Sequence, residues 1–135
     1  MEEIMLDQDI KVFTIAARSF PEGVMEAHTK LHSMVPFSSE RRYFGLSRPE
    51  NGQIVYKAAA ETLTQDETQE INLENMVIKR GTYMSIMIED FMKDIQRIGE
   101  AFKEILTHPA IDPEGYCVEW YIKDKDLKCM VRLNK

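Results

Sequence analysis

Hydrophobic positions along the chain follow strand-like and helix-like spacings, and the order of elements occurs twice. In the first half, apolar and β-branched residues predict a strand over Ile10–Ala17. A helix then follows, because apolar residues recur at helical spacing up to a stop at Pro36: Val24, Ala27, Leu31 and Val35. Two further strands are expected over Arg42–Ser47 and Ile54–Ala60. Ser19 and Glu22, with Pro21 between them, fit a capping box and predict that the helix begins at Ser19.

The second half repeats this order. Met76–Ile88 is strand-like and is interrupted by Gly81. The acidic Glu89 and Asp90 precede a strongly amphipathic helix, which ends at His108-Pro109 and has its apolar stripe at Phe91, Ile95, Ile98, Phe102 and Ile105. Tyr116–Ile122 and Leu127–Leu133 predict a closing hairpin with its turn at 123–126.

The chain of 135 residues is therefore expected to form one α+β domain over residues 1–135. Its half-repeats, at about 9–61 and 76–135, would be duplicated β-α-β-β units related by a pseudo-twofold axis. Residues 62–75 form an acidic linker without lysine or arginine, which we interpret as a solvated connection. Each half would form a small antiparallel sheet with one helix on one face. The bare faces would then meet in a cleft, the kind of place where ligands bind.

Strand alternation divides the last hairpin into two faces. We assign the uniformly apolar set to the face beneath the second helix: Val118, Trp120 and Ile122. Glu119 and Tyr121 then point into the cleft. The same alternation separates Tyr83 from Met84, Ile86 and Ile88, and it places Tyr83 in the cleft as well. Tyr43 and Tyr56 occupy the matching hairpin of the first half.

A carboxylate surrounded by tyrosine rings suits an organic cation, because the ring faces attract positive charge and the carboxylate neutralises it. A Glu buried without such a ligand would have a raised pKa. The structural alternative is that Glu119 lies on a solvated outer face, and tyrosines are in any case common in half-buried strands.

Composition narrows the possible partners. The formal charge of -6 and the pI of about 5.1 argue against a nucleic-acid-binding face. No apolar run is long enough to cross a bilayer, and the acidic N-terminus lacks the features of a signal peptide. We expect Cys117 and Cys129 to be free thiols in a reducing cytoplasm.

Other constellations are weaker. His28 and His32 have a spacing that can hold zinc, but Thr29 replaces the Glu of the metalloprotease motif and no third ligand is evident. No phosphate-binding loop or nucleophile elbow is present, and the spacing of Cys117 and His108 does not support a nucleophile and its base. We therefore predict neither a metal nor a cofactor.

The sequence ValIleLysArgGlyThrTyr (77–83), an amphipathic helix, and then GluTrpTyr (119–121) resembles the GyrI-like domain. This is the effector-binding domain of bacterial multidrug-responsive transcription regulators, within the SOUL-type superfamily. The resemblance covers essentially the whole chain. It implies a ligand cleft centred on Glu119, with Tyr121 and Tyr83 carried over more loosely. Only about nine residues precede the first strand, too few for a helix-turn-helix, so we expect no direct nucleic-acid binding.

Three functions remain open. The first is a stand-alone binding protein for hydrophobic, cationic or aromatic small molecules, with Glu119 as charge partner and with Tyr121, Tyr83, Tyr56 and Tyr43 as walls. The second is a hydrolase of strained electrophilic toxins, with Glu119 as general base and Tyr121 in support. The third is a modulator of a protein partner, either gyrase-inhibitor-like or a transcription co-regulator, acting through the acidic linker. A monomer or weak dimer is expected.

Overall fold

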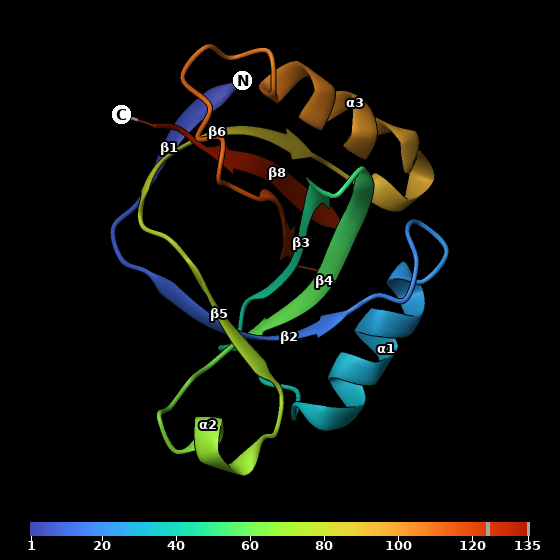
Figure 1. Ribbon diagram of the computed structural model, residues 1–135, viewed down its shortest axis with the longest axis vertical. Coiled ribbons are helices and arrows are strands. Elements are labelled where there is room, and N and C mark those ends of the chain that lie inside the picture. The colour runs from blue at the N-terminus through green and yellow to red at the C-terminus, as the bar shows by residue number, and fades with distance from the viewer. Residues whose placement is uncertain (124, 135) are drawn as a thin grey trace.

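The computed structural model describes residues 1–123 and 125–134, and it shows an α+β fold with one curled antiparallel sheet (Figure 1). Residue 124, in the expected turn of the last hairpin, lies outside the described residues. The elements in chain order are β1 (Glu2–Leu6), β2 (Ile10–Ala16), α1 (Val24–Met34), β3 (Tyr43–Glu50), β4 (Gln53–Glu61), α2 (Glu67–Glu70), β5 (Glu74–Ile78), β6 (Gly81–Ile88), the 3-10 helix η1 (Phe91–Lys93), α3 (Gln96–Ile105), β7 (Cys117–Ile122) and β8 (Asp126–Arg132).

The eight strands form a single sheet in the order β1-β6-β8-β7-β3-β4-β2-β5, and not two separate small sheets as expected. Sequence patterning missed the pairing of β3 with β7, which links the strands of the two halves in antiparallel register. The chain also exchanges its edge strands, because β1 pairs with β6 while β5 pairs with β2. The segment between β1 and β2 and the segment between β5 and β6 are joined by a hydrogen bond, in which the Arg80 N–H donates to Asp9 Oδ1 at 2.8 Å. The exchange curls the sheet around an interior.

This curl creates three hydrophobic clusters. The interior cluster takes residues from every strand, including Val12, Phe44, Tyr83, Val118 and Met130. The other two lie on the outer face, where α1 packs on β2 and β4 and α3 packs on β6 and β8. Figure 1 shows both helices outside the curl. Both faces of the sheet are therefore buried along much of its width.

The two long helices begin later than their sequences suggest. The capping-box prediction is wrong, because α1 begins at Val24 and no side chain caps it. Residues 19–23 instead form turns in which the Gly23 N–H donates to the Ser19 carbonyl at 3.1 Å. The second helix is interrupted at Asp94, so Ile95 is 58% exposed and leaves the buried stripe, whereas Phe102 and Ile105 remain in the core.

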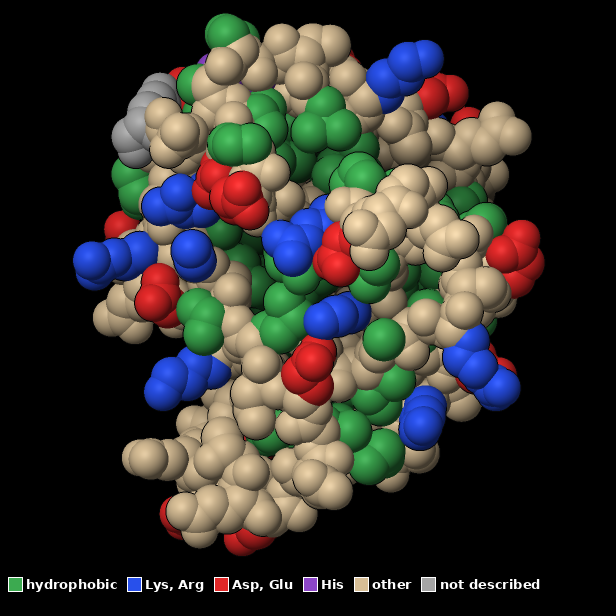
Figure 2. Space-filling model, in the orientation of Figure 1, with side chains coloured by type: hydrophobic (Ala, Val, Ile, Leu, Met, Phe, Trp, Pro, Cys, Tyr) green, Lys and Arg blue, Asp and Glu red, His purple; other side chains and the backbone are tan. Residues whose placement is uncertain are grey.

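The exterior is mixed in character. On the face seen in Figure 2, acidic and basic side chains are interspersed with hydrophobic ones. Within the described residues, every helix is too short or too polar to cross a membrane. Cys117 and Cys129 are free thiols.

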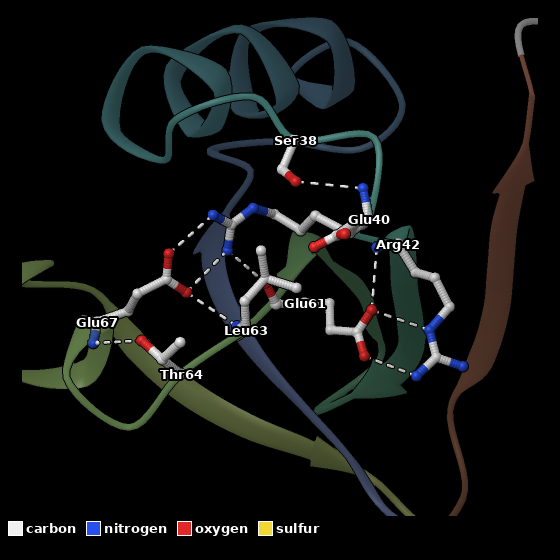
Figure 3. Close-up of polar contacts among 8 residues, drawn as sticks. Ser38, Glu40, Arg42, Glu61, Leu63, Thr64 and Glu67 are labelled. Carbon is white, nitrogen blue, oxygen red and sulfur yellow. Dashed lines mark hydrogen bonds and ion pairs between the residues drawn. The ribbon is translucent and has the colours of Figure 1, made fainter.

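The segment between β4 and β5 is held by an ion pair and is not a fully solvated linker. The guanidinium of Arg41, whose side chain is 2% exposed, donates to both carboxylate oxygens of Glu67 at 3.0 and 2.8 Å. Arg41 also donates to the Glu61 carbonyl at 2.6 Å, and Glu67 accepts the Leu63 N–H at 2.8 Å (Figure 3). These hydrogen bonds, first those from Arg41, lower the pKa of Glu67 to about 2.

We expect Glu67→Gln to lower the free energy of unfolding by roughly 2–3 kcal/mol, because it leaves the buried Arg41 charge without its partner. The loss is smaller than for a fully buried pair because Glu67 retains some exposure. Glu70→Gln on the same helix is the matched control, and urea unfolding is the measurement. Equal stabilities of the two variants would contradict the anchoring role.

The same pair predicts how stability depends on pH. The folded-state pKa of Glu67, about 2, lies below its ordinary value of 4.5. Its contribution is therefore complete above pH 4.5 and is lost as the pH falls towards 2. We expect the stability difference between the wild type and Glu67→Gln to be constant from pH 7 to pH 5 and to shrink below pH 4.5. A difference that grows on acidification would contradict this assignment.

Candidate functional site

Glu119 lies on the strip of the outer sheet face between the two helices. Strands β7 and β3 form this strip, with the α3-covered strands on one side and the α1-covered strands on the other. In the pairing of β3 with β7, Glu119 is directly opposite Gly45. The fold thus places a carboxylate where neither helix sits directly above the sheet.

Two tyrosine hydroxyls converge on one oxygen of this carboxylate. Glu119 Oε1 accepts a hydrogen bond from Tyr121 Oη at 2.7 Å and from Tyr56 Oη at 3.2 Å. His28, from α1, has its Nε2 atom 2.8 Å from Tyr56 Oη. The direction of this bond depends on the histidine tautomer: when Tyr56 gives its single proton to Glu119, His28 donates to Tyr56 from a protonated Nε2. A hydrogen-bonded chain therefore runs from His28 through Tyr56 to Glu119.

Burial sets the protonation states of this cluster. Glu119 is 9% exposed, and its burial raises the pKa of the carboxyl, although the two tyrosine hydrogen bonds oppose the shift. The pKa of His28 is lowered to about 4, first by burial and then by His32. Burial and the neighbouring Glu119 also raise the pKa of Tyr56 and of Tyr121. At neutral pH the histidine and both tyrosines are neutral, so Glu119 is the group of this cluster whose charge can change.

Aromatic rings surround the cluster. Phe20 stacks on Tyr56 with ring centroids 5.8 Å apart, and Phe91 lies 5.7 Å from Tyr121. His28 meets Tyr121 edge-on at 5.3 Å. Phe20 is 43% exposed, so the aromatic surface continues from the buried carboxylate towards solvent.

Gly45 allows Tyr56 to reach Glu119. A Cβ atom at this position would overlap the Tyr56 hydroxyl, and it would lie 2.7 Å from Tyr56 Cζ and 2.9 Å from Glu119 Oε1. The tyrosine therefore crosses directly over a residue that has no side chain. A sequence pattern cannot show this requirement, because it depends on the pairing of β3, β4 and β7.

The structure brings together three of the five predicted site residues: Glu119, Tyr121 and Tyr56. Tyr43 shares their sheet face, but its ring lies against His32 at 5.0 Å and Phe37 at 6.4 Å. The placement of Tyr83 beside Glu119 is wrong. Tyr83 is in the interior cluster, and its hydroxyl donates to the Lys79 carbonyl at 2.6 Å.

The error for Tyr83 comes from the assignment of the β7 faces, which the structure reverses. Val118 and Trp120 face the interior, whereas Cys117 and Tyr121 pack in the cluster beneath α3. The more uniformly apolar face of a strand identifies the helix side only when the opposite face is bare. The curl of the sheet buries that face instead, so apolar character alone does not identify the helix side.

Sequence reasoning missed the roles of Gly45, Phe20 and His28. In the sequence, the spacing of His28 and His32 suggests only a zinc pair. The structure directs His28 to Tyr56 and His32 to Tyr43. No cluster of three or more metal-ligating side chains occurs among the described residues. The available signal for His28 was its helical spacing of one turn from Leu31, which places it near the sheet-facing side of α1.

Comparison with known proteins identifies the fold but no family. No protein-family model and no curated protein matches the chain. A solved integron cassette protein from the mobile metagenome of Vibrio cholerae is similar, with a TM-score of 0.69 and 12% identity, over 98% of this chain and 94% of that chain. A hydrolase from Listeria innocua gives a TM-score of 0.51 and 9% identity, over 98% and 90% of the two chains. At these identities the likeness extends to the fold alone.

We expect Gly45→Ala to displace Tyr56 from Glu119 and to lower the free energy of unfolding by roughly 1–3 kcal/mol, because the added methyl group overpacks the site. Gly99→Ala is the control, since nothing lies within 4 Å of a Cβ there and alanine favours a helix. Gly99→Ala should be neutral or stabilising by up to about 1 kcal/mol. Denaturant unfolding of both variants tests this, and equal stability would show that Gly45 is not required for close approach.

Proposed function

We propose that this chain binds hydrophobic organic cations, with Glu119 as the charge partner. The observation that carries the proposal is the arrangement around this carboxylate. It is buried among aromatic rings, and all its hydrogen bonds from described residues reach Oε1, from two neutral hydroxyls. Oε2 accepts none from the described part of the chain, so it can face the positive charge of a ligand.

The chemistry favours a cation over a neutral ligand. A cation beside Glu119 would compensate its charge more strongly than neutral hydroxyls do, because hydrogen bonds and contacts between ionised groups are the stronger ones. The faces of Phe20, Tyr56 and Tyr121 would add about 0.5–2 kcal/mol each, depending on desolvation. Because the pKa of Glu119 is raised, cation binding would favour loss of its proton. Affinity should therefore increase with pH.

A second part of the proposal concerns the family of this chain and the origin of its fold. We infer that the chain is a GyrI-like domain built from two related halves. The strand order supports this, because β6-β8-β7 and β2-β4-β3 lie in matching order on either side of the β3–β7 joint. The exchange of β1 and β5 between the halves has the same symmetry. In this reading, Glu119 and Gly45 are at matching positions of the two halves, and only the second half carries the carboxylate.

Thermal unfolding with tetraphenylphosphonium tests the binding proposal. A ligand at 100 times its Kd stabilises by about 2.7 kcal/mol, which should raise the Tm by several degrees in a domain of this size. We expect this shift in the wild type, a larger shift at pH 8 than at pH 5, and little shift in Glu119→Gln. Tetraphenylborate, an anion of the same shape, is the ligand control.

The variant itself needs a control without ligand. The folded-state pKa of Glu119 is raised above its unfolded value, so ionisation of the carboxyl destabilises the fold as the pH rises. Glu119→Gln should therefore remain folded at pH 8. If tetraphenylphosphonium shifts the Tm of wild type and Glu119→Gln equally, Glu119 is not the charge partner.

A second candidate function is hydrolysis of a strained electrophile, favoured by the hydrogen-bonded chain from His28 to Glu119 and by the short Tyr121 bond. One structure of this fold is described as a hydrolase. Glu119 would take a proton from water, whose oxygen would then bond to a ring carbon of a cyclopropane. The ring C–C bond would break, and the carbanion that forms would take the proton that Glu119 had removed from water.

Turnover distinguishes hydrolysis from binding. Incubation of the protein with excess cyclopropane-bearing electrophile, followed by mass spectrometry, should give more than one equivalent of water adduct. We expect the rate to rise with pH as Glu119 ionises, and to fall at least 100-fold in Glu119→Gln. Conversion that stops at one equivalent, or that survives in Glu119→Gln, would exclude this function for the cluster.

A further inference from the structure

The interior of the curled sheet contains a cavity that is separate from the Glu119 cluster. Its volume is about 360 Å³, at the small end of the range for ligand pockets. It opens where β3 and β8 end and β7 begins, beside the segment that joins β5 to β6. Val118, one of its lining residues, is next to Glu119 in sequence, and it therefore points to the opposite face of the sheet.

The floor of this cavity is apolar, and its side chains are packed in the interior cluster. Leu46, Ile78, Tyr83 and Val118 are each less than 5% exposed and belong to the interior cluster. The hydroxyl of Tyr83 is satisfied by the Lys79 carbonyl, and burial raises the pKa of Tyr83 to about 12. This tyrosine is therefore neutral, and the floor offers a ligand apolar surface.

The rim carries positive charge with unused donors. The Arg48 guanidinium lies 4.3 Å from the centre of the Tyr116 ring, and its Nε and Nη1 bond to Glu50 and to the Glu114 carbonyl. Arg132 uses Nε and Nη1 for the Arg80 carbonyl and for Asp112, at 2.9 and 3.3 Å. In both cases Nη2 makes no hydrogen bond to a described residue.

Lys79 is the rim cation that is most available. It is exposed, and none of the carboxylates in residues 1–123 and 125–134 forms an ion pair with it. The lining contains three cations, Arg48, Lys79 and Arg132, against two acids, Asp112 and Glu114. The lining is therefore net positive by one charge in a chain whose net charge is -6. Asp112 already accepts hydrogen bonds from Arg132 and from the Glu114 N–H.

We propose that this cavity binds a compact aromatic carboxylate, with its ring on the interior floor and its carboxylate at Lys79. The ring would bury apolar area against Leu46 and Val118. The free Nη2 groups of Arg48 and Arg132 would supply further hydrogen bonds to the acid. This second site has a ligand preference opposite to that proposed for Glu119, and it does not depend on that proposal.

Isothermal titration calorimetry with 2-naphthoate tests the site, with 2-naphthamide as the uncharged ligand of the same shape. We expect one equivalent of naphthoate to bind, with an affinity at least fivefold higher than that of naphthamide. Lys79→Gln should weaken naphthoate binding by roughly twofold to fivefold, the usual range for one exposed charge contact.

Two control variants locate the binding. Lys128→Gln removes a half-buried cation that lines a larger cavity of about 690 Å³ at the other end of the interior, where the lysine lies over Trp120. Glu119→Gln alters the outer-face cluster. Both should bind naphthoate as the wild type does. The proposal is overturned if naphthoate shows no saturable binding up to millimolar concentration, if naphthamide binds equally well, or if a control variant loses binding while Lys79→Gln retains it.

Discussion

The pairing of β3 with β7 is the constraint on which the rest of the structure depends. It joins the strands of the two halves into one sheet, and it sets Gly45 opposite Glu119. Because Gly45 has no side chain, the Tyr56 ring can cross β3 and place its hydroxyl on the carboxylate. A slip of one residue in this pairing would turn Glu119 away from Gly45 and exchange the faces of β7. The register therefore determines both the core and the candidate site.

The two faces of β7 are both buried but by different partners. Val118 and Trp120 meet other strands across the interior, whereas Glu119 and Tyr121 lie on the side of the helices. The exchange of the edge strands makes this possible, because it closes the sheet around its own apolar face. A second sheet is then not needed to cover that face. The outer strip between α1 and α3 remains the place where a polar group can be buried beside side chains from both helical regions.

Sequence patterning predicts the helices and most strands because their apolar spacing is local. Leu31 and Ile105, both fully buried, lie on the stripes that helical periodicity indicates. Alternation also separates Tyr83 correctly from Met84, but it cannot say which face of a strand meets a helix when both faces are buried. The close approach over Gly45 and the bond from His28 to Tyr56 involve residues far apart in sequence. No local pattern encodes those contacts.

The burial of Glu119 is not explained by the stability of the fold. A carboxylate with a raised pKa is destabilising when ionised, and two neutral hydroxyls compensate its charge only in part. A neutral amide of the same shape could keep hydrogen bonds to Tyr56 and Tyr121 without that cost. The fold nevertheless surrounds Glu119 with aromatic rings, and the arrangement requires a residue without a side chain at Gly45. An arrangement that opposes stability and is supported from several elements is typical of a functional site, and here the group it supports is one that attracts a cation or a proton.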